Sequence, residues 1–209
     1  VCVYSQFVPH AKAQLTGTNI KVATVTNFPH GGNDPILAMK ETETARIRGA
    51  DEIDIVFPYQ AYMAGDNKMA EELVQACREA CGPDVSLKVI IESGVLQTEK
   101  LIRGASDICL AQGADFLKTS TGKVSVNATL EATEYMLTSI KQSGLDVGFK
   151  AAGCIKTTEQ ALEYLSLAEN MMGPDFLHAD RFRFGASSLL SNLLASIEGR
   201  QQAKDNLVY

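Results

Sequence analysis

Short apolar runs alternate with longer amphipathic segments along most of the chain. The runs are rich in β-branched and aromatic residues, which is typical of buried strands in a parallel sheet. The first run, VCVY at the start of the chain, has this character and is expected to be a buried strand. The pattern predicts strands at 1–4, 21–26, 52–57, 86–91, 116–119, 146–151 and 183–185.

The segments between the runs carry helix signals. Asp34 before Pro35 and Thr98 before an amphipathic segment fit N-terminal caps, and Gly144 fits a C-terminal stop. The segment 58–67 is expected to be a loop. Helices are predicted at 9–15, 35–48, 69–81, 98–112, 127 or 129 to 143, 158–170 and 187–197.

Strand centres recur roughly every 28 to 36 residues, which is the spacing of a strand followed by a helix. Such repeats build either a doubly wound sheet or a TIM (β/α)₈ barrel. No G-x-G-x-x-G motif follows the first strands, and polar residues gather at the carboxyl ends of many strands, so we favour the barrel. We expect one barrel domain over 1–198 and a flexible polar tail over 199–209.

Only seven strands are predicted, whereas a closed barrel of this type has eight. We therefore expect the barrel to lack its first βα element at the N-terminus. The chain begins at Val1 without an initiator methionine. Two interpretations stay open, a fragment of a longer chain and an incomplete barrel of reduced activity, and the missing methionine favours the fragment.

Composition narrows the function classes. The net charge of −6 gives no reason to expect nucleic acid or an anionic membrane as a partner, and no apolar run approaches the roughly 20 residues of a membrane span. The five cysteines lack zinc-site spacing and are expected to be reduced thiols of a cytoplasmic protein. His10, His30 and His178 are scattered, so we expect no metal and no other cofactor.

Three ionisable residues lie within or at the ends of apolar strands: Asp54, Lys118 and Lys150. A buried charge is costly unless it is paired, so each needs a reason. A structural ion pair is one explanation. Another strand lysine, Lys88, either partners these charges or points toward the outer helices, and the sequence does not decide between the two.

The second explanation is a lysine that attacks a carbonyl to form a Schiff base. Such a lysine must be neutral, and lowering its pKa from about 10.4 to about 7 needs roughly 4 kcal/mol. A second ammonium about 5 Å away supplies roughly 3 kcal/mol at an effective dielectric of about 20, and burial supplies the remainder. We assign Lys118 as nucleophile, Lys150 as the neighbouring cation, and Asp54 as a proton carrier acting with Lys150 and a water.

A phosphate site is predicted in the loops that follow strands near the end of the chain. Barrels often bind phosphate there, on backbone N–H groups at a helix N-terminus. Small residues before a helix also occur simply as caps, which is the alternative reading. The candidate phosphate-binding residues are Gly122, Gly153, Gly185, Ser187 and Ser188.

With these residues in place, the chain resembles the deoxyribose-phosphate aldolase family of class I aldolases over nearly its whole length. The segments that carry the resemblance are ATVTNFPHG, GADEIDIVFPY, LKVIIESG, GADFLKTSTGK, GFKAAG and RFGASS. The resemblance implies reversible cleavage of 2-deoxy-D-ribose 5-phosphate to D-glyceraldehyde 3-phosphate and acetaldehyde, in deoxyribose phosphate catabolism. It implies the same roles for Lys118, Lys150 and Asp54, and phosphate binding at the glycines and serines above.

The resemblance further implies that Tyr209 assists proton transfer from the tail. One departure lies after Lys150, where the family has Pro-Ala-Gly-Gly and this chain has AAGC, so that Cys154 brings a Cβ to a glycine position. A non-enzymatic or impaired sugar-phosphate binder, and another class I aldolase or transaldolase, stay as alternatives. The expected partners are the small-molecule substrates, and the oligomeric state is open, with a homodimer as the candidate assembly.

Overall fold

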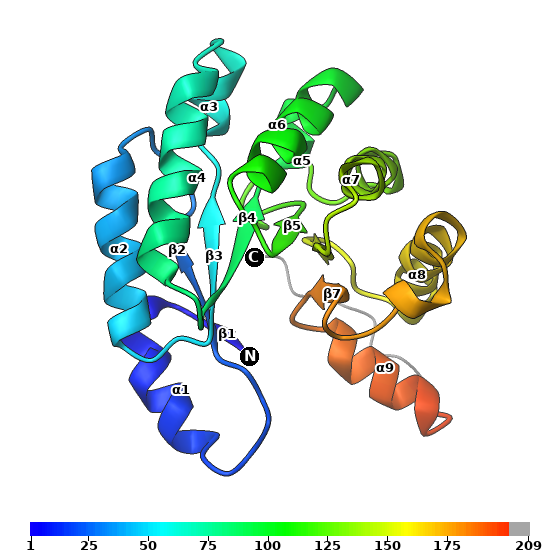
Figure 1. Cartoon of the computed structure of the whole chain (residues 1–209). Coiled ribbons are helices and arrows are strands. Elements are labelled where there is room, and N and C mark those ends of the chain that lie inside the picture. Colours follow the sequence, from blue (N-terminus) through cyan, green and yellow to red (C-terminus); the bar gives the residue numbers. More distant parts are fainter. Residues whose placement is uncertain (201–209) are drawn as a thin grey trace.

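The computed structural model describes residues 1–200 and arranges seven strands in one curled parallel sheet (Figure 1). The strands pair in chain order, each parallel to the next, and a strand between β7 and β1 would be needed to close a barrel. No strand within residues 1–200 fills that place. The bounds are β1 (Cys2–Val3), β2 (Ala23–Thr26), β3 (Glu52–Val56), β4 (Ser86–Ile90), β5 (Phe116–Lys118), β6 (Gly148–Ala152) and β7 (Phe182–Gly185).

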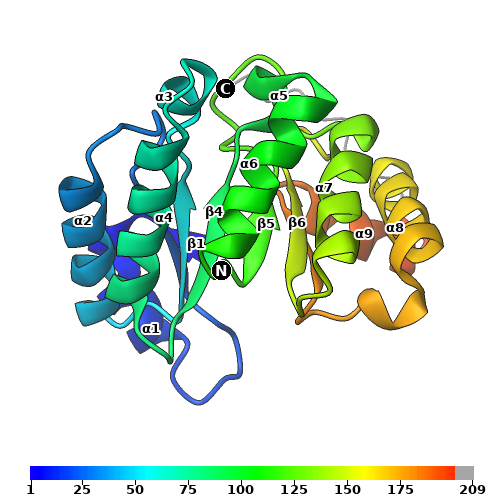
Figure 2. The same ribbon diagram turned by 45° about the horizontal axis from the view of Figure 1, so that its top comes forward.

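Helices follow the strands, and α2, α4, α6, α7 and α8 cover the outer side of the sheet (Figure 2). This is the α/β architecture of a TIM barrel, as expected. The helices are α1 (Val8–Gln14), α2 (Pro35–Ile47), α3 (Tyr59–Met63), α4 (Asn67–Cys81), α5 (Ser93–Leu96), α6 (Glu99–Ala111), α7 (Leu130–Ser143), α8 (Thr158–Met172) and α9 (Leu189–Ile197), with 3₁₀ turns η1 (Ser5–Phe7) and η2 (Pro174–Phe176). None of these helices is long and apolar enough to cross a membrane.

The predicted helix signals are confirmed at the atomic level. The side chains of Asp34, Thr98 and Thr129 each accept a hydrogen bond from a backbone N–H in the first turn of α2, α6 and α7. Gly144 ends α7 in the left-handed conformation. These local interactions set where helices begin and end, and so fix the lengths of the loops that carry the candidate site.

Alternation along the strands separates two environments. On β3, Ile53 and Ile55 are fully buried and face the covering helices, whereas Asp54 points to the concave side of the sheet. The apolar core therefore lies between sheet and helices, and Leu87, Val89, Leu117 and Phe149 continue it on the neighbouring strands. The concave side is left for polar groups.

Two expectations for the chain segments are wrong. The strand expected to be buried at 1–4 is only Cys2–Val3, and Cys2 is exposed because β1 is the last strand on its side of the sheet. The loop expected at 58–67 contains the short helix α3. Most of the predicted tail, including Tyr209, lies outside the described residues.

Candidate active site

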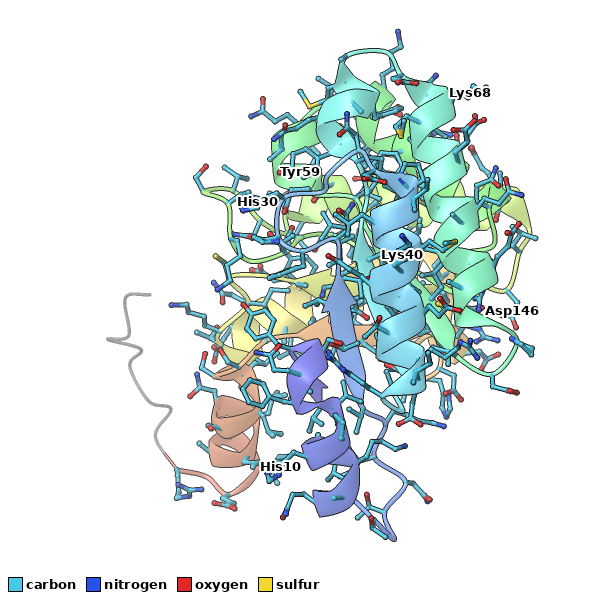
Figure 3. All side chains as sticks on the ribbon, turned by 90° about the vertical axis from the view of Figure 1, so that its left-hand side faces the viewer. His10, His30, Lys40, Tyr59, Lys68 and Asp146 are labelled. Carbon is cyan, nitrogen blue, oxygen red and sulfur yellow. The ribbon has the colours of Figure 1, made fainter. Side chains whose placement is uncertain are left out.

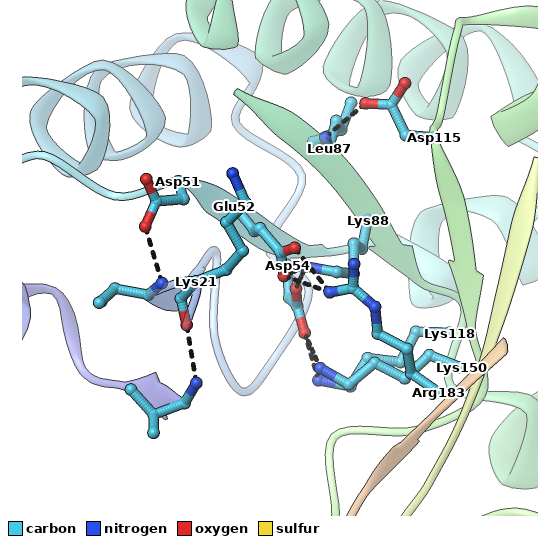
Figure 4. A network of polar contacts seen from close by, with 12 residues as sticks. Lys21, Asp51, Glu52, Asp54, Leu87, Lys88, Asp115, Lys118, Lys150 and Arg183 are labelled. Atoms are coloured by element: carbon cyan, nitrogen blue, oxygen red, sulfur yellow. Dashed lines mark hydrogen bonds and ion pairs between the residues drawn. The ribbon is translucent and has the colours of Figure 1, made fainter. Parts of the chain in front are cut away.

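The site is built around Asp54, which is fully buried in the middle of β3. Its Oδ2 atom accepts hydrogen bonds from Lys118 Nζ on β5 at 2.8 Å and from Lys150 Nζ on β6 at 2.9 Å. Lys118 and Lys150 are register partners on adjacent strands, and β4 separates both from β3. Such contacts are possible only across the concave side of the curled sheet (Figure 4). The three residues singled out from the sequence are therefore brought together.

The charged cluster continues toward the amino ends of the strands. Lys88 on β4 lies between Asp54 and Glu52, with Nζ 2.9 Å from Asp54 Oδ1 and 2.6 Å from Glu52 Oε2. Arg183 on β7 donates to both oxygens of Glu52, at 2.6 and 2.8 Å (Figure 4). Its guanidinium also stacks on the Phe116 ring. Lys88 therefore partners the carboxylates and does not point toward the helices.

Sequence reasoning missed Glu52 and Arg183. A signal for Glu52 was present, because it stands two residues before Asp54 in a strand and so shares its face. Nothing local marks Arg183 as its partner, since β4, β5 and β6 lie between the two strands that carry these residues. Together with Asp54 and the three lysines, they place four cationic side chains against two carboxylates.

The pKa values of Lys118 and Lys150 are shifted in opposite directions. Burial is the largest influence on Lys118 and lowers its pKa; Asp54 opposes this, Lys150 adds to it, and the net pKa is lowered. Burial also acts on Lys150, but attraction by Asp54 prevails and its pKa is raised. Burial disfavours the charged form of Asp54, yet Lys118, Lys88 and Lys150 hold its pKa well below the usual range.

These directions match the electronic requirements of a Schiff-base site. Lys118 is the amine more easily neutralised, and Lys150 is the one that keeps its proton. The balance of causes differs from the expectation, in which the neighbouring ammonium supplied most of the shift. In the folded chain burial is the larger cause, because both lysines are only 7% exposed and Asp54 lies between them.

The candidate phosphate residues gather at the carboxyl ends of β5, β6 and β7, where Gly185 is the last residue of β7 and the others lie in the loops that follow. The N–H of Gly153 donates to the carbonyl of Gly185 at 3.3 Å, which joins the β6 and β7 loops. Ser188 directly precedes α9 and makes no side-chain cap, and Ser187 is exposed beside it. Gly122, also exposed, lies in the loop that follows Lys118. The geometry provides a helix N-terminus next to small residues, as a phosphate site needs.

Cys154 follows Gly153 with a left-handed backbone, at a φ of 63°. A non-glycine residue adopts this conformation at a cost, and its Cβ occupies space that glycine would leave open. Its Sγ lies 3.4 Å from Asn127 Nδ2, a contact between the β6 and β5 loops. The departure noted in the sequence is thus also a point of backbone strain.

The histidines and the hollow around Arg78 lie outside the cluster around Asp54. His10 and His30 lie far apart on the molecule (Figure 3), and no group of three His, Cys, Asp or Glu side chains within residues 1–200 could hold a metal ion. A hollow of about 390 Å³ lies at the amino ends of the strands, around Arg78. There Arg78 is bound to Asp115 and to the carbonyl oxygens of Gly82 and Val85, which is a structural role.

Comparisons with known proteins agree with this architecture. The family model described as DeoC/LacD family aldolase matches residues 1–193. The solved structure of "QR15, an Aldolase" is 29% identical with a TM-score of 0.79, covering 96% of this chain and 84% of that one. A candidate deoxyribose-phosphate aldolase from Toxoplasma gondii ME49 is 26% identical with a TM-score of 0.87, covering 96% and 81%. Deoxyribose phosphate aldolase from Aeropyrum pernix shares the fold at 21% identity, with a TM-score of 0.74 and coverage of 94% and 76%.

Proposed function

Because the chain belongs to the DeoC/LacD family of aldolases, we propose that it is a class I aldolase whose Schiff base forms on Lys118. The proposed reaction is the reversible cleavage of 2-deoxy-D-ribose 5-phosphate to D-glyceraldehyde 3-phosphate and acetaldehyde. The observation that carries the proposal is the position of Lys118, buried against Asp54 and Lys150 with a lowered pKa. A site that only bound phosphate would have no use for a lysine tuned in this way.

In the cleavage direction the neutral amine of Lys118 attacks the aldehyde carbon of the open-chain sugar, and loss of water gives a protonated imine. Removal of the proton from the C3 hydroxyl then breaks the C2–C3 bond, whose electron pair moves toward the iminium nitrogen. Glyceraldehyde 3-phosphate leaves and an enamine stays on Lys118. Protonation of the enamine carbon and addition of water release acetaldehyde, so the water lost at imine formation is regained and no external oxidant or reductant is needed.

Asp54 and Lys150 are proposed to move these protons. Lys150 keeps its proton, because the carboxylate of Asp54 raises its pKa, and can donate to the reacting oxygen or carbon. Asp54 contacts both lysines through the same oxygen, so it can exchange protons with either one directly or through a water. Its ionised form also balances the positive charge of the imine.

The phosphate group is proposed to bind where the loops after β5, β6 and β7 meet. Gly122, Gly153 and Gly185 are proposed to let the backbone approach the phosphate, with the Gly153 N–H bonded to the Gly185 carbonyl. The hydroxyls of Ser187 and Ser188 before α9, and the backbone N–H groups at the start of that helix, are the proposed donors. The surplus of cationic side chains in the concave cluster also favours an anionic substrate. Assistance from Tyr209 stays a prediction, because that residue lies outside the described part of the chain.

The proposed setting is cytoplasmic breakdown of deoxyribose phosphate derived from deoxynucleosides. The proposal needs no metal and no organic cofactor. The relative from Aeropyrum pernix is described as tetrameric, which supports self-association of this chain. The oligomeric state stays open, with a homodimer as the candidate assembly, and light scattering on the purified protein measures it.

Turnover of 2-deoxy-D-ribose 5-phosphate by the Lys118→Ala variant tests the proposed function. We expect activity to fall by at least about a thousandfold, since the covalent route is lost. The matched control is Lys100→Ala, which removes an exposed lysine on α6 and should act like the wild type. Retained turnover in Lys118→Ala would refute the Schiff-base assignment, and a wild-type chain that binds sugar phosphate without cleaving it would favour the non-enzymatic alternative.

A further inference from the structure

Glu92 is a buried carboxyl group that the reaction outlined above does not use. It lies two residues beyond the end of β4 and is fully buried. Its backbone is left-handed, with a φ of 55°, a conformation that is uncommon and costly for a residue with a side chain. A charged group held in a strained conformation without access to solvent indicates a specific role for its contacts.

Those contacts are with the loop that follows Lys118. The hydroxyl of Thr121 donates to Glu92 Oε2 at 2.5 Å, and the backbone N–H of Thr121 donates to Oε1 at 3.2 Å. Thr121 Oγ1 in turn accepts from the backbone N–H of Lys123 at 3.1 Å. One carboxylate therefore anchors a chain of hydrogen bonds that runs from Thr121 to the exposed Lys123, in the loop that follows Lys118.

The residues after Glu92 hold the same loop at two further points. The N–H of Ser93 donates to the carbonyl of Thr119 at 2.9 Å. Gly94 packs so closely on the loop that an added Cβ would stand 1.9 Å from the carbonyl oxygen of Val126. The segment 92–94 thus contacts the loop 119–126 near its start at Thr119, at Thr121 and at its end at Val126.

The charge of Glu92 acts on the same loop. Burial raises the pKa of the Glu92 carboxyl, while the Thr121 bonds and the positive charge of Lys118 oppose that rise. Lys118, from β5, is the charged group that influences Glu92 among the described residues. By the same attraction an ionised Glu92 favours the protonated form of Lys118.

We propose that Glu92 is a positioning residue for the proposed reaction, holding Thr121 so that the loop presents Lys118 and Lys123 in a fixed relation. The inference rests on the proposed function, since it concerns the geometry of the same site. It assigns a role to a carboxyl that does not touch the three central residues. It also gives a reason for the strained backbone, because the left-handed Glu92 directly precedes α5 while its side chain bonds Thr121.

The test compares Glu92→Gln, Thr121→Val and Thr121→Ser with the control Glu43→Gln, an exposed position on α2. In Glu92→Gln an amide donor replaces the oxygen that accepts the Thr121 hydroxyl. We expect KM for 2-deoxy-D-ribose 5-phosphate to rise and kcat to fall, each by about tenfold, consistent with the loss of a charged hydrogen bond. Thr121→Val should behave alike, the double variant should be no worse than the poorer single variant, and Thr121→Ser should be close to wild type.

A second readout separates positioning from a merely structural role. Removal of the Glu92 charge should shift the acid limb of imine trapping by acetaldehyde and borohydride to lower pH, because Lys118 then loses its proton more easily. Hydrogen exchange of the loop 119–126 should also become faster in Glu92→Gln and Thr121→Val. Lower kcat with unchanged KM, pH limb and loop exchange would overturn the proposal, as would variants equal to wild type.

Two further outcomes are distinguishable. If the wild-type chain neither traps acetaldehyde nor cleaves the sugar phosphate, the proposed function fails and the positioning role fails with it. If the wild type is active and folded variants are unaltered, the positioning role alone is refuted. Should Glu92→Gln fail to fold, Thr121→Val decides the matter, because Thr121 is only partly buried and lies in a loop.

Discussion

The two faces of the sheet differ in the side chains that they bury, which are apolar on the outer face and charged on the concave face. On the outer face, Ile53 and Ile55 pack under helices in a fully apolar layer. On the concave face, one residue away, Asp54 and Glu52 lie in a cluster with three lysines and Arg183. Apolar packing stabilises in proportion to buried area, whereas buried ion clusters are weak contributors to stability. The outer face therefore supplies most of the stability of the fold, whereas the charged cluster on the concave face is explained by the proposed Schiff-base reaction.

Among substitutions on the two faces of the sheet, the largest loss of stability and activity is expected at Asp54. Asp54→Ala removes the carboxylate that three lysines share, so it leaves buried ammonium groups without their partner. We expect a loss of about 3 kcal/mol in the free energy of unfolding, and loss of turnover. Urea unfolding and the cleavage assay measure the two effects, and wild-type stability in this variant would show that the cluster is not coupled as described.

Substitution of Lys150 should change the pH dependence of imine formation on Lys118. The pKa of Lys118 is lowered in the folded chain, so its neutral fraction, and with it the rate of imine formation, grows as pH rises through that pKa. Lys150→Leu removes a cation that lowers it and leaves Asp54 free to raise it. The acid limb of borohydride trapping should therefore move up by about one pH unit or more.

The control for that shift is Lys100→Leu, an exposed lysine on α6. Its acid limb should coincide with that of the wild type. A Lys150→Leu variant with an unshifted limb would mean that Lys150 does not influence the amine of Lys118. An acid limb shifted to lower pH would mean that Lys150 raises the pKa of Lys118 and does not lower it.

The outer face should respond to substitution in stability alone. Ile55→Val removes one buried methylene between β3 and the helices, and the expected cost is about 1 kcal/mol in the free energy of unfolding. KM, kcat and the pH limb should stay at wild-type values, because the concave cluster keeps every contact. A change in KM or kcat from this substitution would contradict the inference that the outer face affects stability and not the reaction.

The smallest expected effect is at Cys154, in the loop after β6. Glycine there relieves the left-handed strain, worth about 1 kcal/mol, but adds about 0.5 kcal/mol of unfolded-state entropy. Cys154→Gly should thus be more stable by about 0.5 kcal/mol, and KM for the sugar phosphate should fall a few-fold because the backbone can approach the phosphate. An increase in KM would indicate that the cysteine side chain itself contacts substrate.

Much of this organisation was predictable from the sequence, for a physical reason. Strand and helix repeats follow from local periodicity, and Asp34 and Thr98 cap helices through contacts three residues away. Asp54, Lys118 and Lys150 stood out because ionised side chains are rare in apolar strands. Their convergence followed from the parallel order of the strands.

What escaped prediction depends on contacts distant in sequence or on unusual backbone. The bond from Arg183 to Glu52 crosses the concave side of the sheet, and no local pattern pairs them. Glu92 became visible only through its left-handed backbone, which turns it toward Thr121. The short helix α3 contains too few residues for a periodic signal to appear.

Whether Lys118 forms the Schiff base is decided by mass spectrometry after incubation of the protein with acetaldehyde and borohydride. We expect the gain of one ethyl group, located on Lys118 and absent from Lys118→Ala. The exposed control Lys100→Ala should label like the wild type. A folded protein that gains no ethyl group, or one labelled equally in Lys118→Ala, would contradict the assignment of Lys118 as the Schiff-base lysine.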